Sequence, residues 1–444
     1  MRELRRLYLN KNINIRNKKC NEVKDSRKED AKNRINVYDA IMGSGKTTAA
    51  NMRMKSYIQN NQKFIYVTPF LKEIQRTKSS LGNDNIFAPK PTNEYVHTEI
   101  ILDENGNINF NKLSRNKYKF LNKGEHFLKL VKDGKNIVTT HALFTALVAS
   151  NAGLFNDYLL IIDEVINPIE VLNFGPRDLE ILTNEKLIAV DSNNKVISTD
   201  KKYKDDSFKT VLAFCKQDNV YLQNNSFISL FPIEIIKAFK EVQILTYLFE
   251  SSLMAAYLKL SNINYNIIKN NSEPKEKELI KNNLTIYEGS RNQSPRSKDT
   301  NYSKSHLTKL SSKQNKSIKN AVTYVFRYEF GSKPNEKAFT TFKIMREKLQ
   351  ARGYIKGFIP VNSRATNEFV NINAMAYLAN RYLNPAIVNF FKSKGVIIDE
   401  DTWALSELIQ WVWRGSIRDK KPMNLYIPSN RMRRLLYQWL DNEL

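Results

Sequence analysis

The chain has 444 residues and carries 70 Lys and Arg against 45 Asp and Glu, which leaves a formal net charge of +25. A chain of this length can hold two or three domains with buried cores, since a domain usually has about 150 residues. So large a positive surplus favours a polyanionic partner, and nucleic acid is the first candidate. The two cysteines and four scattered histidines argue against a disulfide framework and against a zinc module.

The first 34 residues are basic and polar, and we interpret them as an N-terminal extension. Their apolar stretches are short and interrupted by charge, so we expect no signal peptide or membrane anchor there. No later run approaches the ~18 consecutive apolar residues of a membrane-spanning helix. The sequence therefore predicts a cytoplasmic protein.

Short β-rich runs alternate with helical patterns from residue 35 onward, which is typical of an α/β fold with parallel sheets. A first group of expected strands is 35–38, 64–67, 137–139, 158–162 and 242–245. A second group is 322–327, 337–341, 355–359 and 424–427. We therefore expect one α/β domain over 35–258 and another over 259–444.

Two segments interrupt this pattern. The first domain contains a long insertion, 167–241, in which we find no chemistry and expect a helical elaboration. The second domain contains a basic stretch rich in Ser and Asn, 288–320, which we expect to be a surface loop. This loop is either simply solvated or follows a phosphate backbone.

A phosphate-binding loop follows the first expected strand. Residues 39–48 read DAIMGSGKTT and precede a helical pattern, which is the Walker A spacing with Ala40 in place of the first glycine. The glycines let backbone N–H groups turn towards the β-phosphate, the lysine reaches the β and γ oxygens, and the first threonine can bind Mg²⁺. The N-terminus of the following helix faces the same phosphates. The residues expected to bind ATP are Gly43, Ser44, Gly45, Lys46, Thr47 and Thr48.

An acidic pair follows another expected strand. The apolar run 158–162 ends in Asp163 and Glu164, and the carboxyl edge of a buried parallel sheet is where ligands sit. We expect Asp163 to hold Mg²⁺ together with Thr47, and Glu164 to orient and deprotonate the attacking water. The alternative is that the two acids merely begin the next helix. A phosphate loop in the same half of the chain favours the hydrolytic interpretation.

Together these segments resemble the superfamily 2 helicases, in particular DEAD-like helicases of phage type. The segments that carry the resemblance are 39–48, 163–166, 245–250 and 406–418. The resemblance implies two tandem RecA-like P-loop domains, ATP and Mg²⁺ between them, and a nucleic-acid strand across both. Segment 245–250 corresponds to motif III, and Tyr247 departs from that motif's pattern.

The segment 406–418 resembles motif VI of this family. Gln410, Arg414 and Arg418 are four residues apart, so on one helix they would line a single stripe. The resemblance implies that all three are catalytic and close on the γ-phosphate from the second domain, although Arg418 comes one residue late. An arginine in that role is worth ~10³ to 10⁵ in rate in other nucleotide hydrolases. The alternative is a solvated basic face.

Neighbouring residues of this segment have simpler explanations. We expect Trp411 and Trp413 to belong to the core of an amphipathic helix rather than to stack on bases. The acidic run 399–401 is expected to cap the N-terminus of the same helix.

Further segments resemble the nucleic-acid-contacting motifs of the family. Residues 66–70 resemble motif Ia, 138–141 the motif Ib region, and 362–367 lie where motif V is expected. The residues that this implies as nucleic-acid contacts are Thr68, Thr139, Thr140, Arg364 and Thr366.

The leading interpretation is an ATP-dependent helicase or translocase of a phage or mobile element, acting in replication or recombination. DNA is favoured over RNA because residues 163–166 read DEVI rather than DEAD, which is an argument by family analogy. The alternatives are an RNA helicase, a genome-packaging ATPase and a nucleic-acid scaffold that does not hydrolyse ATP. The sequence identifies no protein partner.

Overall fold

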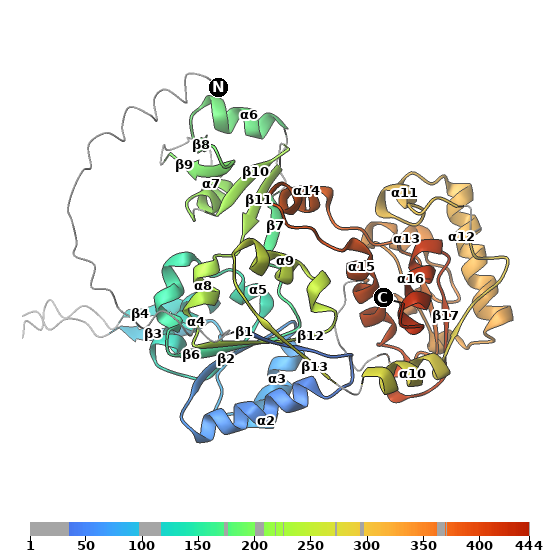
Figure 1. Cartoon of the computed structure of the whole chain (residues 1–444), viewed down its shortest axis with the longest axis horizontal. Coiled ribbons are helices and arrows are strands. Elements are labelled where there is room, and N and C mark those ends of the chain that lie inside the picture. The colour runs from blue at the N-terminus through green and yellow to red at the C-terminus, as the bar shows by residue number, and fades with distance from the viewer. Residues whose placement is uncertain are drawn as a thin grey trace, which may run out of the picture.

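The computed structural model describes residues 35–96, 117–172, 176–199, 208–217, 219–224, 226–270, 273–293, 297–361, 369 and 371–443. It contains two α/β domains with parallel sheets, joined side by side, and an antiparallel sheet above the first (Figure 1). The expected fold class is thereby confirmed. The N-terminal extension 1–34 lies outside the described residues. Within them, no helix is both long and apolar enough to cross a bilayer.

The first domain is built on a six-stranded parallel sheet in the order β13-β1-β12-β6-β2-β5. Its central strands are runs of buried aliphatic residues, as expected of a parallel sheet covered on both faces. All five strands expected in this domain are present. The strands are β1 (Ile35–Asp39), β2 (Lys63–Thr68), β5 (Ile137–Thr140), β6 (Tyr158–Asp163), β12 (Glu241–Thr246) and β13 (Asn266–Lys269).

Strand β13 moves the domain boundary. It pairs with β1 in parallel, with Asn266 opposite Asn36, so the first domain continues to Lys269 and the boundary expected after residue 258 is wrong. Four residues of β-rich sequence at a sheet edge give too short a pattern to be recognised from the sequence alone.

Helices cover both faces of this sheet. On one face α2 (Lys46–Gln59) and α3 (Leu71–Leu81) pack over β2, β6 and β12. The other face is covered by α4 (Lys123–Lys132), α5 (His141–Phe144), α8 (Ile233–Ala238) and α9 (Leu253–Leu260). A ribbon of two strands, β3 (Thr92–Val96) and β4 (Lys117–Leu121), extends from one side (Figure 1).

The insertion 167–241 is mainly a sheet, so the helical elaboration expected there is wrong. Its five antiparallel strands follow the order β7-β11-β10-β9-β8, with α6 (Pro176–Asn184) and α7 (Lys209–Cys215) beside them. Tight turns at Asn194 (φ 63°) and Asn224 (φ 45°) reverse the chain, and asparagine tolerates this backbone region well. The strands are β7 (Ile169–Leu172), β8 (Ile188–Val190), β9 (Lys195–Ser198), β10 (Val220–Gln223) and β11 (Ser226–Leu230).

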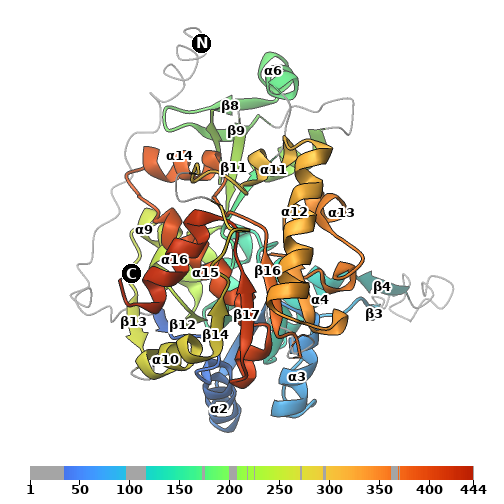
Figure 2. The same ribbon diagram turned by 90° about the vertical axis from the view of Figure 1, so that its right-hand side faces the viewer.

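The second domain contains a four-stranded parallel sheet in the order β14-β17-β16-β15. The strands expected at 337–341 and 424–427 are confirmed. The strands are β14 (Leu284–Ile286), β15 (Lys337–Thr340), β16 (Ala374–Tyr377) and β17 (Met423–Tyr426). On one face lie α15 (Glu400–Val412) and α16 (Asn430–Leu440), and on the other α12 (Ser312–Tyr324) and α13 (Arg346–Leu349), as Figure 2 shows for α12. Helix α10 (Glu273–Asn283) leads into β14.

Two strands expected in this domain are wrong. Residues 322–327 belong to the end of α12 and to a π-helical turn, Val325–Glu329. Val322, Val325 and Phe326 are buried at helical spacing and pack into one cluster, so the short apolar run has the period of a helix. Residues 355–359 form a 3-10 turn with a single bridge from Phe358 to Phe339.

The basic stretch 288–320 is also not one loop. It contains α11 (Lys304–Thr308) and most of α12, whose N-cap Ser311 forms a capping box with Gln314. A sequence rich in Lys, Ser and Asn looks like a linker by composition, but the cap and the apolar residues that follow make it a helix.

A helix of the second domain reaches back to the insertion. In α14 (Pro385–Ser393), Ile387, Phe390 and Phe391 join the core cluster of the first domain. The rings of Phe390 and Tyr221 lie 5.4 Å apart, and Lys394 Nζ donates to the carbonyl of Asn193 at 3.1 Å. The two domains therefore touch through α14 as well as through α15 (Figure 1).

Candidate active site between the two domains

The phosphate loop joins β1 to α2. Gly43 (φ 81°) and Gly45 (φ 84°) lie in the left-handed region, which glycine enters without steric cost. Lys46 Nζ donates to the carbonyl oxygens of Ala40 and, at 2.9 Å, Ile41, so the loop wraps around the ammonium group. Burial lowers the pKa of Lys46, and the nearby acids Glu164 and Asp163 oppose this shift.

Asp163 is the last residue of β6 and lies at the carboxyl edge of the sheet. The Tyr66 hydroxyl donates to Oδ2 of Asp163 at 2.7 Å, and His141 Nε2 donates to its backbone carbonyl at 2.9 Å. Burial raises the pKa of Asp163 to about 6, although the Tyr66 hydrogen bond acts in the opposite direction. The sequence analysis includes Tyr66 in the segment that resembles motif Ia but gives it no role, because its contact with Asp163 joins two strands that are far apart in the sequence.

Glu164 has an unusual backbone. Its φ of 62° lies in the left-handed region, where a residue with a side chain is strained by roughly 1–3 kcal/mol. Its N–H donates to the carbonyl of Leu245 at 2.9 Å, which holds the residue against the end of β12. Among the described residues the buried Oε2 of Glu164 has no hydrogen-bond partner. A strained backbone with a buried acceptor left open is the kind of arrangement found at functional sites.

The loop after β12 links the phosphate loop to the second domain. Asp39 accepts hydrogen bonds from the backbone N–H groups of Leu248 (2.8 Å) and Phe249 (3.1 Å). The hydroxyl of Tyr247 donates to Glu273 Oε1 at 2.6 Å and accepts from Trp439 Nε1 at 2.8 Å. The residue that departs from the motif III pattern is therefore a contact between the domains, a role that no local pattern reveals.

Removing the Tyr247 hydroxyl should destabilise the protein. In Tyr247→Phe the buried Trp439 N–H loses its acceptor, which should cost about 1–3 kcal/mol of unfolding free energy. Urea unfolding of the full chain measures the change. The matched control is Tyr437→Phe, whose hydroxyl bonds the exposed Glu288, and it should shift the midpoint much less. Equal shifts in the two variants would contradict the contact.

The second domain contributes residues from the end of α15. Gln410 lies in its last turn, Arg414 follows the helix and is 3% exposed, and Arg418 lies in a 3-10 helix, Ser416–Asp419. The single helical stripe expected for these three residues is therefore wrong, because the helix ends at Val412. The break and the second helix nevertheless bring all three side chains to one cavity.

This cavity, which we call the nucleotide cavity after the ligand proposed for it below, has a volume of about 330 Å³ and lies between the domains. The first domain lines it with the phosphate loop and the acidic pair, and the second with the end of α15. Its lining includes Gly43, Gly45, Lys46, Thr47, Thr48, Asp163, Glu164, Gln410, Trp413, Arg414 and Arg418. Ser44 lines an adjoining cavity with Lys46 and Arg53. Lys46 and Arg414, which are 368 positions apart in the chain, thus line one cavity.

The two tryptophans have different surroundings. Trp411 is fully buried and its Nε1 donates to the carbonyl of Ile359 at 3.2 Å, which confirms the expected core position. Trp413 is only partly buried, but it packs against the core cluster of the second domain, so the core position expected for it is confirmed in part. It also packs on the phosphate loop, since a Cβ atom built on Gly43 would lie 2.5 Å from Cζ2 of its ring.

The contact predicts unequal effects for two glycine substitutions. Gly43→Ala and Gly45→Ala both add a Cβ at left-handed φ, and this strain costs roughly 1–3 kcal/mol in each. Only at Gly43 does the added carbon meet the Trp413 ring, because nothing lies within 4 Å at Gly45. Gly43→Ala should therefore lower the melting temperature more than Gly45→Ala does. A Trp413→Ala background should remove the difference, and its persistence would contradict the packing.

The expected nucleic-acid contacts are only partly described. Thr68 and Thr139 are 0% and 1% exposed, so their hydroxyls do not reach a surface and the contact expected of them is wrong in this conformation. Thr140 accepts a hydrogen bond from Leu143 N as the N-cap of α5. Arg364 and Thr366 lie outside the described residues. The acids 399–401 behave as expected, because Asp399 caps α15 through the N–H groups of Asp401 and Thr402.

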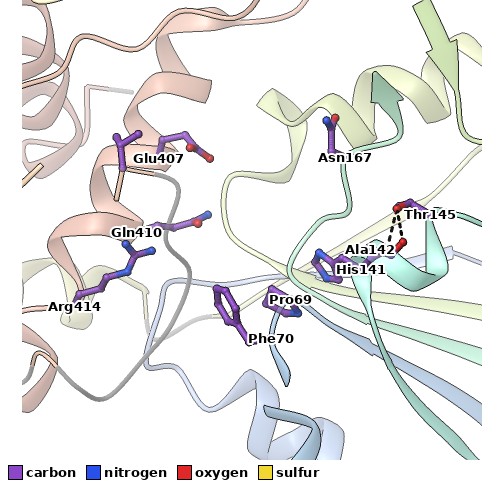
Figure 3. Close-up of a pocket in the computed structure, with 10 residues that line it drawn as sticks. Pro69, Phe70, His141, Ala142, Thr145, Asn167, Glu407, Gln410 and Arg414 are labelled. Carbon is purple, nitrogen blue, oxygen red and sulfur yellow. Dashed lines mark hydrogen bonds between the residues drawn. The ribbon is translucent and has the colours of Figure 1, made fainter. Parts of the chain in front are cut away.

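A second cavity of about 380 Å³ adjoins the nucleotide cavity. Gln410 and Arg414 line both, and Figure 3 shows their side chains reaching from the second domain towards Phe70 and Pro69. His141, Thr145 and Asn167 form its other wall. A ligand placed here would touch both domains beside the residues that line the nucleotide cavity.

The chain has a close relative of phage origin. It is 35% identical to the SPbeta prophage-derived uncharacterized protein YonV of Bacillus subtilis (strain 168) over 436 residues, which covers 92% of this chain and 99% of that protein. Residues 278–440 match the model of the YonV C-terminal Rossmann-like domain. This match runs from α10 to the end of α16, so it coincides with the second parallel sheet and its helices.

Comparison with solved structures finds helicases at low similarity. The chain titled XPD_APO is 11% identical with a TM-score of 0.48, and the match covers 92% of this chain and 96% of that chain. The chain titled XPD_Helicase is also 11% identical with a TM-score of 0.47, and the match covers 92% of this chain and 95% of that chain. The helicase MrfA bound to DNA and AMPPNP is 12% identical with a TM-score of 0.33, over 92% of this chain and 48% of its own. Likenesses this distant carry no information on activity. By its full-length similarity to the prophage protein, the chain belongs to the YonV family.

Proposed function

We propose that the protein is an ATP-dependent nucleic-acid motor, a helicase or translocase, that hydrolyses ATP between its two domains. One observation carries the proposal: a single cavity is lined by Lys46 and Thr47 of the phosphate loop, by Glu164 after β6, and by Arg414 and Arg418 of the second domain. When hydrolysis needs groups from both domains, the chemical step depends on the distance between them. A motor needs that coupling to convert ATP turnover into movement.

The phosphate loop would bind the triphosphate. The left-handed backbone at Gly43 and Gly45 turns N–H groups inward, and the N-terminus of α2 adds its dipole. Lys46 would exchange its hydrogen bonds to the Ala40 and Ile41 carbonyls for bonds to the β and γ oxygens. The lysine is already held beside the site, so little reorganisation is needed.

The remaining residues would carry out hydrolysis. The open Oε2 of Glu164 is a buried acceptor suited to orient a water molecule and take its proton. Arg414 and Arg418 would stabilise the charge that develops on the transferring phosphoryl group. Thr47 and Asp163 offer the hydroxyl and carboxylate oxygens that Mg²⁺ prefers, and the ion when bound would offset the charge of the phosphates.

The proposed substrate strand is DNA rather than RNA, in the replication or recombination of a phage or mobile element within a bacterial cytoplasm. The prophage origin of the relative supports the biological setting. The preference for DNA rests on the sequence of residues 163–166. The formal charge of +25 supports a polyanionic partner.

ATP turnover measured with single-stranded DNA, forked DNA, duplex DNA and RNA tests the proposal. We expect stimulation by DNA and loss of turnover in Lys46→Ala, which removes the phosphate-binding ammonium group. Lys55→Ala, an exposed lysine on the same helix, is the control and should retain turnover. Nucleic-acid-independent turnover, or an active Lys46→Ala variant, would contradict the motor. Cutting of plasmid DNA with Mg²⁺ or Mn²⁺ would instead favour a packaging ATPase.

A further inference from the structure

Helix α12 lies on the side of the second domain that faces away from the nucleotide cavity. It packs on the sheet face opposite to α15 and α16, as the two separate core clusters show. In Figure 1 it lies at the far end of the molecule from the first domain, and in Figure 2 it runs along the exposed front. A ligand bound to α12 would therefore not touch the nucleotide cavity.

One face of α12 lines a hollow of about 650 Å³. The helix contributes residues at helical spacing, and the loop after β14 contributes Ser290 and Arg291 opposite them. The helical residues are Lys313, Lys316, Ser317, Ile318, Asn320, Ala321 and Tyr324. The other face of the helix buries Asn315 and Val322 against the domain, which fixes the direction of the hollow.

The hollow is strongly basic. Arg291, Lys313 and Lys316 line it, and the sequence of α12 contains no acidic residue. The acids of the adjoining loop are engaged elsewhere, because Glu288 pairs with Arg433 at 3.1 Å and Asp299 with Arg434 at 3.4 Å. The positive side chains of the hollow are therefore left to attract an external anion.

Aromatic rings lie at the C-terminal end of the α12 face that lines the hollow. The guanidinium of Arg291 lies 4.4 Å from the Tyr324 ring centroid, and the rings of Tyr324 and Tyr328 are 5.3 Å apart. Tyr328 is 65% exposed, and Arg327 lies 5.2 Å from the centroid of its ring. A π-helical turn presents both residues, and such turns are frequent at functional sites. Exposed rings interleaved with cations are what unpaired bases and phosphates require.

We propose that this α12 surface, made of Arg291, Lys313, Lys316, Tyr324, Arg327 and Tyr328, is a second binding site for single-stranded nucleic acid. From Lys313 to Tyr324 the helix covers roughly 16 Å at ~1.5 Å per residue, which is room for several phosphates of a strand. The cations bind the backbone and Tyr328 stacks on a base, so the site needs no particular sequence. The choice of ligand class rests on the proposed function, but the binding itself needs no ATP hydrolysis.

The test compares the affinity of full-length variants for fluorescent oligo-dT and oligo-U, without ATP and over a range of salt. Lys313→Ala/Lys316→Ala should weaken binding at least tenfold and reduce the slope of log K against log salt by about 1.4, since each single-strand phosphate contact contributes ~0.7. Tyr328→Ala should weaken binding about tenfold with the slope unchanged. The control Lys275→Ala/Lys392→Ala removes two exposed lysines elsewhere and should do neither.

The outcomes separate this proposal from the motor. The proposal of the α12 surface would be overturned if Lys313→Ala/Lys316→Ala and Tyr328→Ala both had the affinity and salt slope of the unmodified protein. This holds even if DNA stimulates ATP turnover. Weakened binding in a protein whose ATP turnover ignores DNA would retain the surface and overturn the motor. An equal loss of duplex binding together with an unaffected Tyr328→Ala variant would overturn the single-strand assignment.

Discussion

Arg414→Ala should lower ATP turnover by about 10³- to 10⁵-fold while leaving nucleotide binding largely intact. The guanidinium is almost fully buried and lines the same cavity as Lys46 and Glu164. Its charge would act mainly on the transferring phosphoryl group, so the loss should fall on kcat more than on KM. Phosphate release measured over a range of ATP concentrations gives both kcat and KM.

Loss of a buried arginine can also destabilise the fold, and Arg433→Ala controls for this. Arg433 is 8% exposed in the same domain and donates to the carbonyl of Ile427, but it does not line the nucleotide cavity. It should lower the melting temperature and keep turnover per folded molecule. Full turnover in Arg414→Ala would mean that the second domain supplies no charge to the reaction.

Glu164→Gln should lower the rate of hydrolysis by about 10²- to 10⁴-fold, the usual worth of a general base. The amide keeps the size of the side chain and the strained backbone but cannot take a proton from water. ATP should bind and remain uncleaved, which single-turnover measurements with radiolabelled ATP detect directly. The control is Glu170→Gln, an exposed acid on β7, the next strand along the chain. A Glu164→Gln variant with unchanged single-turnover rate would assign water activation to another group.

The parts of the fold that were predictable have strong local signals. The buried strands of the first sheet are continuous aliphatic runs, and the phosphate loop is marked by two glycines at fixed spacing. The insertion gave no such signal, because strands of three to five residues in an antiparallel sheet alternate too briefly to be distinguished from helical turns. The turns at Asn194 and Asn224 were the available clue.

The site was predictable in its residue types but not in its geometry. Lys46, Glu164 and Arg414 are recognisable from motifs, and the motifs of Lys46 and Glu164 also place them at the carboxyl edge of the first sheet. The packing of Trp413 on Gly43 and the hydrogen bond between Tyr247 and Trp439 join segments almost 200 or more positions apart. Such contacts follow from how the two domains meet, which no short pattern encodes.

Helix α14 connects the second domain mechanically to the antiparallel sheet of the insertion. Phe390 and Phe391 are buried with β10 and β11, while β7 of the same sheet begins only five residues after Glu164. Any rotation of the C-terminal half must either break this apolar seam or swing the antiparallel sheet with it. Movement of this sheet would pull on residues 165–168, which join Glu164 to β7, and would change the position of the Glu164 carboxylate. A mechanical load on the second domain would then change the rate at which Glu164 activates water.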